Sequence, residues 1–228
     1  MTSYGAIAVS SATTPPAETA SILARILDGI ALELTVGDED VQASIAHDHH
    51  DAQGWLRRVD AWHTSLKSEL GDISVGHAAP RSGPAASRRT RYEAAEALRL
   101  GERAFGGGHL TGYSDAQLAA FLLRHADLDD LRSLYERTLG KLFDEDRKRG
   151  GDLLATLHAY CDTGGSLSQT AERLGVHRNT VLYRVRRIQS VTLTNLQDGP
   201  SRLLMQVGMV AGRLARPAVT HSLRRAPA

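Results

Sequence analysis

Residues 166–188 read Ser-Leu-Ser-Gln-Thr-Ala-Glu-Arg-Leu-Gly-Val-His-Arg-Asn-Thr-Val-Leu-Tyr-Arg-Val-Arg-Arg-Ile. In the first half, side chains suited to packing recur at helical spacing, at positions 167, 170, 171 and 174. Ser166 followed by Gln169 has the pattern of a capping box that begins a helix. Gly175 tolerates the left-handed conformation that ends a helix, and Val176 can fill the angle to the next one. The segment therefore predicts two helices joined by a tight turn.

The second predicted helix, residues 177–189, has one apolar stripe. Val181, Val185 and Ile188 recur at i, i+4 and i+7, so we expect them to face the core of the domain. The remaining side chains face solvent or a ligand, and they include four arginines (His177, Arg178, Asn179, Thr180, Tyr183, Arg184, Arg186 and Arg187). Charge runs usually form a solvated face. Here, however, the turn residues, the spacing of the apolar side chains and the polar residues on the opposite side all indicate a DNA-reading helix.

Residues near the amino end of such a helix reach base edges in the major groove, whereas later residues and those on its flanks reach phosphates. We therefore expect Arg178 to read bases, because its planar fork donates two hydrogen bonds to guanine, worth roughly 1–3 kcal/mol of discrimination. Asn179 and Tyr183 are secondary base readers, and Thr180, Arg184 and Arg187 suit phosphate oxygens. The complete predicted DNA-binding set is Ser168, Gln169, His177, Arg178, Asn179, Thr180, Tyr183, Arg184 and Arg187.

The segment from Leu153 to Leu214 resembles the carboxy-terminal helix-turn-helix domain of PucR and CdaR-type bacterial transcriptional regulators. The resemblance lies in residues 153–160, in the turn at 164–166, in Val176-His177-Arg178-Asn179-Thr180-Val181, and in Tyr183-Arg184 with Arg187-Ile188. The second helix is also similar to that of the nucleoid protein Fis. Residues 189–196 depart from the family, because they replace its usual leucine-glycine connection. The resemblance implies a sequence-specific transcriptional regulator that binds double-stranded DNA and is not an enzyme.

Charge is distributed unevenly along the chain. The whole chain has a formal net charge of only +1. Residues 1–150 carry 17 Lys and Arg against 22 Asp and Glu, whereas residues 151–228 carry 10 against 4. A basic module beside an acidic one is the distribution expected for a polyanion-binding domain.

Length and composition allow two modest globular domains in the 228 residues. No apolar run is long enough to span a bilayer, and residues 1–5 lack the basic start of a secretion signal, so we expect a cytoplasmic protein with no membrane partner. The one cysteine, Cys161, falls on the apolar side of a predicted helix, and we interpret it as a core side chain instead of a redox sensor.

The first half of the chain has the order β-α-β-β-α-β. Strands are predicted at residues 4–9, 32–36, 41–46 and 73–76, and helices from about residue 15, at 52–70 and at 88–104. Side chains predicted to face inward are Ile22, Leu23, Ile26, Leu27 and Ile30 in the first helix, Trp55, Leu56, Val59, Trp62 and Leu66 in the second, and Tyr92, Ala95, Leu98 and Leu100 in the third. The pattern is that of a ferredoxin-like sheet, and residues 73–76 with 91–98 and Gly101 look like the GGDEF-like domain of CdaR-type regulators.

The predicted fold class is therefore α+β, a ferredoxin-like or degenerate GGDEF-like domain followed by an all-α helix-turn-helix domain. The expected boundaries are 1–112 for the first domain, 113–150 for connecting helices, 151–214 for the DNA-binding domain and 215–228 for a disordered basic tail. The apolar positions Leu203, Leu204, Val207, Val210 and Leu214 are expected to form a last core helix, which could also serve as a dimer surface. Because one such domain rarely supplies enough contact alone, we expect a homodimer.

A nucleotide-binding or cyclase-like enzyme is the alternative function. Gly37-Asp38-Glu39-Asp40 sits in a predicted hairpin, where diguanylate cyclases carry their signature. The first strand, however, ends Ala8-Val9-Ser10-Ser11 and offers no carboxylate for the metal ions of that chemistry. Residues 47–51, His-Asp-His-His-Asp, could suggest a metal site, but adjacent residues converge poorly on one ion, and Asp51 suits a helix cap. We expect no cofactor and no metal; a small-molecule effector, if there is one, acts through the acidic module or through a sensor partner.

Overall fold

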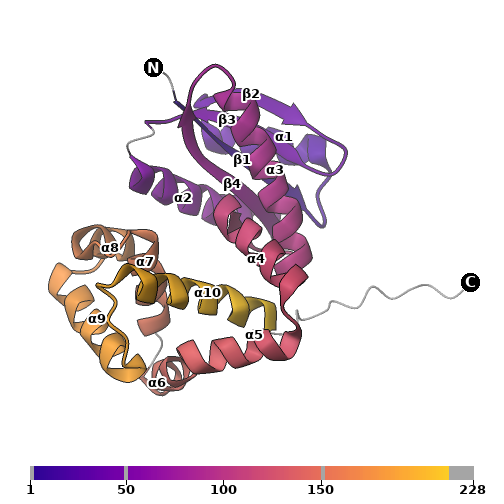
Figure 1. Ribbon diagram of the computed structural model, residues 1–228. Coiled ribbons are helices and arrows are strands. Elements are labelled where there is room, and N and C mark those ends of the chain that lie inside the picture. Colours follow the sequence, from indigo (N-terminus) through magenta and orange to yellow (C-terminus); the bar gives the residue numbers. More distant parts are fainter. Residues whose placement is uncertain (1–2, 49–50, 150–151, 216–228) are drawn as a thin grey trace, which may run out of the picture. The chain divides into compact units, whose positions relative to one another are not determined.

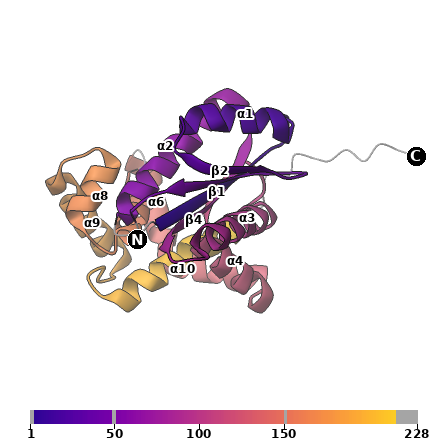
Figure 2. The ribbon, with the colours of Figure 1, turned by 90° about the horizontal axis from the view of Figure 1, so that it is seen from above.

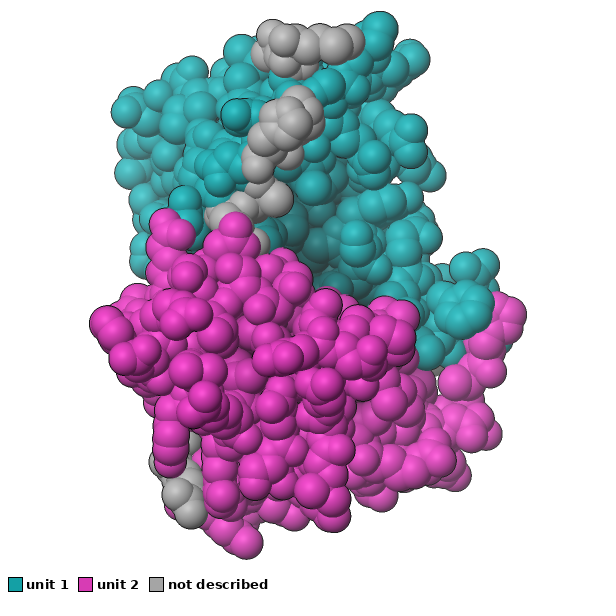
Figure 3. All heavy atoms as spheres, turned by 60° about the vertical axis from the view of Figure 1, so that its left-hand side comes forward, with its two compact units in different colours: residues 1–124, 216–228 teal, residues 125–215 magenta. Residues whose placement is uncertain are grey.

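The computed structural model describes residues 3–48, 51–149 and 152–215. Their internal packing divides them into two compact units, one of residues up to Arg124 and the other of residues 125–215 (Figure 3). The first unit is built around a sheet and the second consists of helices. The predicted α+β class, with an all-helical carboxy-terminal part, is confirmed.

The first unit has a five-stranded sheet in the order β2-β3-β1-β4-β5 (Figure 1). The strands are β1 (Ser3–Ser11), β2 (Ala31–Val36), β3 (Val41–Ala46), β4 (Ile73–Ser82) and β5 (Leu110–Gly112). Strand β1 pairs antiparallel with β3 and β4, and β2 pairs antiparallel with β3, whereas β5 runs parallel to β4. The first four strands thus have the predicted ferredoxin-like arrangement, and the short β5, which was not predicted, extends it.

Helices α1 (Pro16–Leu27) and α2 (Ala52–Leu70) pack on one face of the sheet (Figure 2). Their apolar stripes cover the larger side chains of the strands, so this face holds the main core of the unit. The predicted inward positions are buried or partly buried, with the exception of Ile30. Asp28 ends α1 in the left-handed conformation, which places Ile30 beyond the helix, where it is exposed.

Helix α3 (Ala86–Phe105) covers the opposite face of the sheet (Figure 2). It approaches the strands closely, because a methyl group added at Gly76 of β4 would collide with the backbone of Ala94 and Leu98. The prediction that Tyr92 faces inward is wrong, since its side chain is 66% exposed. Small residues such as Ala94, Ala97 and Gly101 decide which face of α3 packs, and the bulky Tyr92 lies outside that face.

Strand β4 continues six residues beyond the predicted end at Gly76 and passes through Pro80. The register between β1 and β4 slips between Tyr4 and Ala6, which pair with Arg81 and Ala78. The irregularity therefore falls at residues 79 and 80, where a proline that lacks an N–H can be accommodated. The connection between β4 and α3 is therefore shorter than the predicted strand at 73–76 and helix at 88–104 imply.

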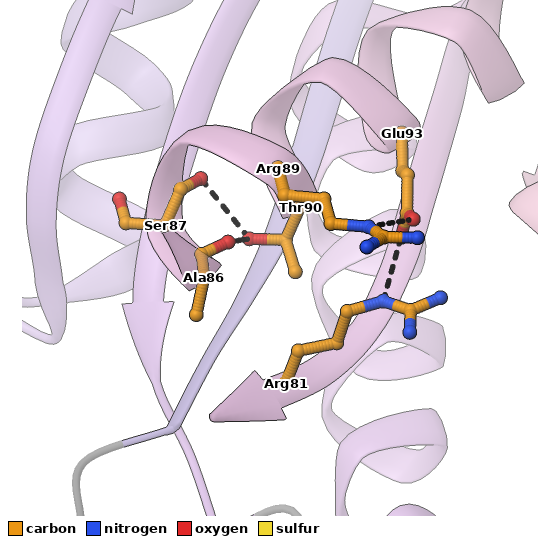
Figure 4. A network of polar contacts seen from close by, with 6 residues as sticks. All are labelled: Arg81, Ala86, Ser87, Arg89, Thr90 and Glu93. Carbon is orange, nitrogen blue, oxygen red and sulfur yellow. Dashed lines mark hydrogen bonds and ion pairs between the residues drawn. The ribbon is translucent and has the colours of Figure 1, made fainter. Parts of the chain in front are cut away.

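A buried carboxylate fixes the start of α3 to β4 (Figure 4). Glu93, whose side chain is 5% exposed, accepts hydrogen bonds from Nε of Arg81 at 3.0 Å and from Nε of Arg89 at 3.1 Å. The Thr90 hydroxyl donates to the carbonyl oxygen of Ala86 at 3.0 Å. Because an unpaired buried carboxylate is costly, both guanidinium groups stabilise Glu93, and the contact with Arg81 of β4 joins the helix to the strand. Helix α3 then ends at Phe105, with Gly106 as its cap, and helix α4 (Tyr113–His125) follows β5.

The second unit consists of consecutive helices. They are α5 (Leu128–Tyr135), the π-helical turn η1 (Glu136–Gly140), α6 (Lys141–Arg149), α7 (Leu153–Asp162), α8 (Leu167–Leu174), α9 (Arg178–Thr192) and α10 (Gly199–Ala215). Their common core includes Leu139 and Leu142 as well as residues of α7 to α10. The segment predicted as connecting helices therefore contributes to the core around the two-helix corner.

Helix α10 packs through small residues. Gly208 lies against Thr138 and Gly212 against the ring of Tyr135, so closely that a side chain at either glycine would collide. The prediction that Leu203 and Leu204 belong to the core is wrong, because they are 59% and 48% exposed. Because α10 packs through these two glycines, its buried face begins at Met205 and continues through Val210 and Leu214.

Across the described residues, every helix is too short or too polar to cross a bilayer.

Candidate nucleic-acid interface

The corner between α8 and α9 has the predicted turn chemistry. The Ser166 hydroxyl accepts a hydrogen bond from the backbone N–H of Gln169 at 3.4 Å, which caps α8. The backbone N–H of Ser166 donates to Thr163 instead of to Gln169, so the cap works in one direction. Gly175 has a φ of 63°, the left-handed conformation that was predicted to end the helix. The N–H of Val176 then donates to the carbonyl oxygen of Ala171 at 3.0 Å and closes the turn.

Hydrogen bonds of buried hydroxyl groups stabilise the corner. The side chains of Thr163 and Thr170 share a hydrogen bond of 2.8 Å, and the Thr170 hydroxyl donates to the carbonyl oxygen of Ser166 at 2.6 Å. Ala171 is buried against the neighbouring helices, as expected for a small residue at a close approach. These contacts set the angle at which α9 leaves the turn.

Helix α9 has the predicted register. Val181, Val185 and Ile188 are buried in the core of the unit. His177 is the amino-terminal cap, and its Nδ1 accepts from the backbone N–H of Asn179 at 3.2 Å. The helix continues to Thr192, three residues beyond the predicted end. The exposed side chains opposite the core recur at helical spacing and form an outer stripe of Asn179, Tyr183, Arg186 and Ser190.

Two of the four arginines on α9 are held by carboxylates of the same unit. Arg184 forms an ion pair with Asp152, which precedes α7. Arg187 donates hydrogen bonds to Glu145 of α6 from Nη2 at 2.6 Å and from Nε at 3.2 Å. Hydrogen bonding to Glu145 raises the pKa of Arg187 above its ordinary value. Both arginines lie on the flank of α9 that faces α6 and α7. These ion pairs attach the helix to its own domain.

The other two arginines, Arg178 and Arg186, are exposed. Within the described part of the chain neither has a carboxylate partner. Arg178 stands in the first turn of α9, where base reading was predicted. Arg186 belongs to the outer stripe, and no contact was predicted for it. Its position seven residues after Asn179 was the signal that placed it on this face.

The remaining predicted site residues gather around the amino ends of the two helices. Ser168 and Gln169 are exposed in the first turn of α8, and His177 and Asn179 are exposed at the start of α9. Thr180 is partly buried on the flank of α9. Polar residues from two separate stretches of chain therefore lie at the amino-terminal ends of α8 and α9.

Helix α7, which supports the corner, has an unusual cap. Asp152 stands at its amino end, but its side chain makes no capping bond. Instead Asp146 of α6 accepts hydrogen bonds from the backbone N–H groups of Leu153 at 2.6 Å and Leu154 at 3.4 Å. Cys161 of α7 is buried, and burial raises the pKa of its thiol to about 12, in line with its interpretation as a core side chain.

The alternative sites in the first half of the chain are accounted for by local structure. Residues 37–40 connect β2 and β3 as a hairpin, with the N–H of Gly37 donating to the carbonyl oxygen of Asp40 at 2.8 Å. Asp51 caps α2 by accepting from the N–H of Gly54 at 2.7 Å, as predicted. Both ring nitrogens of His47 are engaged, by the carbonyl oxygen of Asp51 and by Arg58. Residues 49 and 50 of the histidine cluster lie outside the described residues.

The corner between α8 and α9 lies in a segment that matches a known domain family. Residues 153–211 match the PucR C-terminal helix-turn-helix domain. The purine catabolism regulatory protein of Bacillus subtilis (strain 168) is 33% identical over 122 residues, which are 54% of this chain and 23% of that protein. An uncharacterized protein of Mycobacterium tuberculosis (strain ATCC 25618 / H37Rv) is 37% identical over 68 residues, which are 30% of this chain and 16% of that protein.

A crystal structure of a regulator of polyketide synthase expression from Bifidobacterium adolescentis aligns with 93% of this chain and 80% of its own, at 17% identity and a TM-score of 0.39. The chain spans less than a quarter of the length of the two curated relatives. Through residues 153–211 the chain therefore carries the carboxy-terminal helix-turn-helix domain of PucR-type regulators.

Proposed function

We propose that the chain is a sequence-specific DNA-binding transcriptional regulator and that α9 enters the major groove. The observation that carries this proposal is the outer stripe of α9, where Asn179, Tyr183 and Arg186 face away from the core while Val181, Val185 and Ile188 anchor the opposite side. A helix presented in this way by a capped turn fits the groove of B-form DNA. The excess of basic residues after position 150 supports the proposal independently.

Roles within the site follow from exposure and charge. Arg178, in the first turn, reads guanine, and Asn179 and Tyr183 contribute to base recognition. Ser168, Gln169, His177 and Thr180 lie at the amino-terminal ends of the two helices, where hydroxyl, amide and imidazole groups hydrogen-bond phosphate oxygens. Arg186 adds a phosphate contact without giving up an existing ion pair.

Arg184 and Arg187 are proposed phosphate contacts of a different kind. In the absence of DNA their guanidinium groups neutralise Asp152 and Glu145. Each can reach a phosphate only by exchanging a carboxylate for it, so part of the electrostatic gain is offset by the ion pair that is lost. We therefore assign Arg186 a larger share of the salt-dependent affinity than either of them.

The proposal is tested by titrating the full chain with duplex DNA selected from genomic fragments, at several salt concentrations. Arg178→Ala should relax the base preference, whereas Arg186→Ala should weaken all sequences alike and lower the log–log salt slope by about 0.9. Lys141→Ala, which removes an exposed cation from α6, is the matched control and should change neither. If the Arg178 and Arg186 variants both bind like the unaltered chain, α9 is not the reading helix.

We further infer that the regulator works as a homodimer in the cytoplasm. Paired domains that read half-sites about 34 Å apart are the usual solution for this type of reader. Sedimentation with and without a palindromic duplex tests the dimer, and a monomer bound to a single half-site would contradict it. The signal that controls binding is assigned to the acidic first half of the chain or to a sensor partner.

We infer, finally, that the chain is not an enzyme. Strand β1 ends in Ser10 and Ser11 and provides no carboxylate beside the 37–40 hairpin, so the metal cage of a cyclase is incomplete. Incubation with GTP and Mg²⁺ should give no turnover. Product formation that disappears in Asp38→Asn would establish the alternative function.

A further inference from the structure

A groove of about 540 Å³ lies between α3 and α4 in the first unit. The two helices run beside each other in both ribbon views (Figures 1 and 2). The side chains that line the groove come from both helices at helical spacing. Four of them are apolar (Leu100, Ala104, Ala120 and Leu123) and five are polar or charged (Glu96, Arg99, Arg103, Gln117 and Arg124).

The charges in the groove do not cancel. Both oxygens of Glu96 are occupied by Arg99, through Nη2 at 2.7 Å and Nε at 3.0 Å. Arg124 donates from Nε to the carbonyl oxygen of Ala120 at 3.3 Å. No carboxylate among the described residues pairs with Arg103 or Arg124, and both are exposed along the groove. Two positive charges therefore remain for a ligand.

This positive groove stands out against the unit that contains it. Residues 1–124 carry 11 Lys and Arg against 15 Asp and Glu, so the unit as a whole is acidic. An anion is repelled by the general field of such a unit and must be held by a local arrangement of cations. The apolar side chains between the arginines form a surface on which the apolar part of an organic ligand can pack, whereas an inorganic ion makes no such contact.

We propose that this groove binds a small organic acid, one with an anionic group held by Arg103 and Arg124 and an apolar body packed on Leu100, Ala104 and Ala120. Its volume lies within the range of small-molecule sites, about 300–1,000 Å³. Guanidinium groups suit carboxylate and sulfonate oxygens because they donate two parallel hydrogen bonds. Binding rests on the residues of the first unit alone. The role of this ligand as the effector of the regulator rests, in addition, on the proposed function of the chain.

The proposal is tested with 8-anilinonaphthalene-1-sulfonate, an aromatic sulfonate whose fluorescence rises in apolar surroundings, titrated into the full chain. Arg103→Glu and Arg124→Glu should each weaken binding at least tenfold. Arg88→Glu makes the same charge change at an exposed position of α3 outside the groove and should leave the dissociation constant within twofold. Benzoate should displace the dye from the unaltered chain.

A second variant separates the groove from other apolar surface. Ala120→Trp fills the groove without altering its charge and should also abolish the benzoate-sensitive fluorescence, and far-UV circular dichroism checks that each variant is folded. Dye binding that is equal in the groove variants and in Arg88→Glu would overturn the proposal. That result would leave the DNA-binding proposal intact, because DNA titrations with the α9 variants decide it separately.

Discussion

Among the described residues, Leu193 is a bulky residue in a backbone conformation that favours glycine. It ends α9 with φ 55° and ψ 32°, in the left-handed region, where a β-carbon costs about 1–2 kcal/mol. Its side chain is 83% exposed and returns little packing energy. This is the connection in which the sequence departs from the leucine-glycine pattern of the family it resembles.

We therefore expect Leu193→Gly to raise the free energy of unfolding by up to about 1 kcal/mol, because relief of strain exceeds the extra entropy of the unfolded chain. Thermal and urea unfolding measure the change. Gly175→Ala is the opposing control: φ is 63° there and the space is open, so the substitution should destabilise by about 1 kcal/mol through backbone strain alone. A loss of stability in Leu193→Gly would contradict this account.

Cys161 is predicted to be chemically silent in the folded protein. Burial raises the pKa of its thiol to about 12, so the thiol stays protonated near pH 8 and should react with iodoacetamide only after unfolding. The unfolded thiol ionises at its ordinary pKa, whereas the folded one does not. Stability should therefore fall as the pH rises above about 9, and Cys161→Ala should lessen that fall. Rapid labelling of the native protein at pH 8 would refute the prediction.

The charge that α9 presents depends on neighbouring residues of its unit. Glu145 of α6 holds Arg187 with two hydrogen bonds. In Glu145→Gln the carboxylate charge is removed while the side-chain shape is kept, so Arg187 becomes available to a phosphate. We expect tighter DNA binding at low salt and a salt slope steeper by about 0.9.

The matched control is Glu136→Gln, which makes the same charge change at an exposed position of η1. Its slope should equal that of the unaltered chain. If Glu145→Gln leaves the slope unchanged, Arg187 serves only to position α9, and the phosphate role assigned to it is lost.

For the whole molecule, the structure indicates where the helical unit proposed to bind DNA begins. The match to known domains starts at residue 153, but the core of the unit includes the fully buried Leu139 and Leu142, and the cap of α7 comes from Asp146. A fragment of residues 125–215 should therefore unfold cooperatively and bind DNA. A fragment that starts at residue 153 should lose at least about 3 kcal/mol of stability, since it gives up two buried leucines and a cap. Equal melting curves for the two fragments would contradict this boundary.

Much of the fold could be read from local patterns. The first four strands, helix α2 and the α8–α9 corner were predicted because caps, turns and apolar periodicity act over a few residues, as at Ser166, Gly175 and Val181. The errors at Tyr92 and at Leu203 and Leu204 share one physical cause. Glycine and alanine determine how closely α3 and α10 pack against their neighbours. The spacing of large apolar side chains does not reveal which face these small residues place inward.

The sequence by itself determined that α9 is a helix with an apolar inner side and an arginine-rich remainder, because those properties depend on residues less than two turns apart. Only the tertiary structure decided which arginines of α9 pair with carboxylates of the described residues. Arg184 and Arg187 meet carboxylates that lie 32 and 42 residues away in the chain, whereas Arg178 and Arg186 face solvent. An ion pair between distant residues depends on how the helices pack, and no local pattern specifies it.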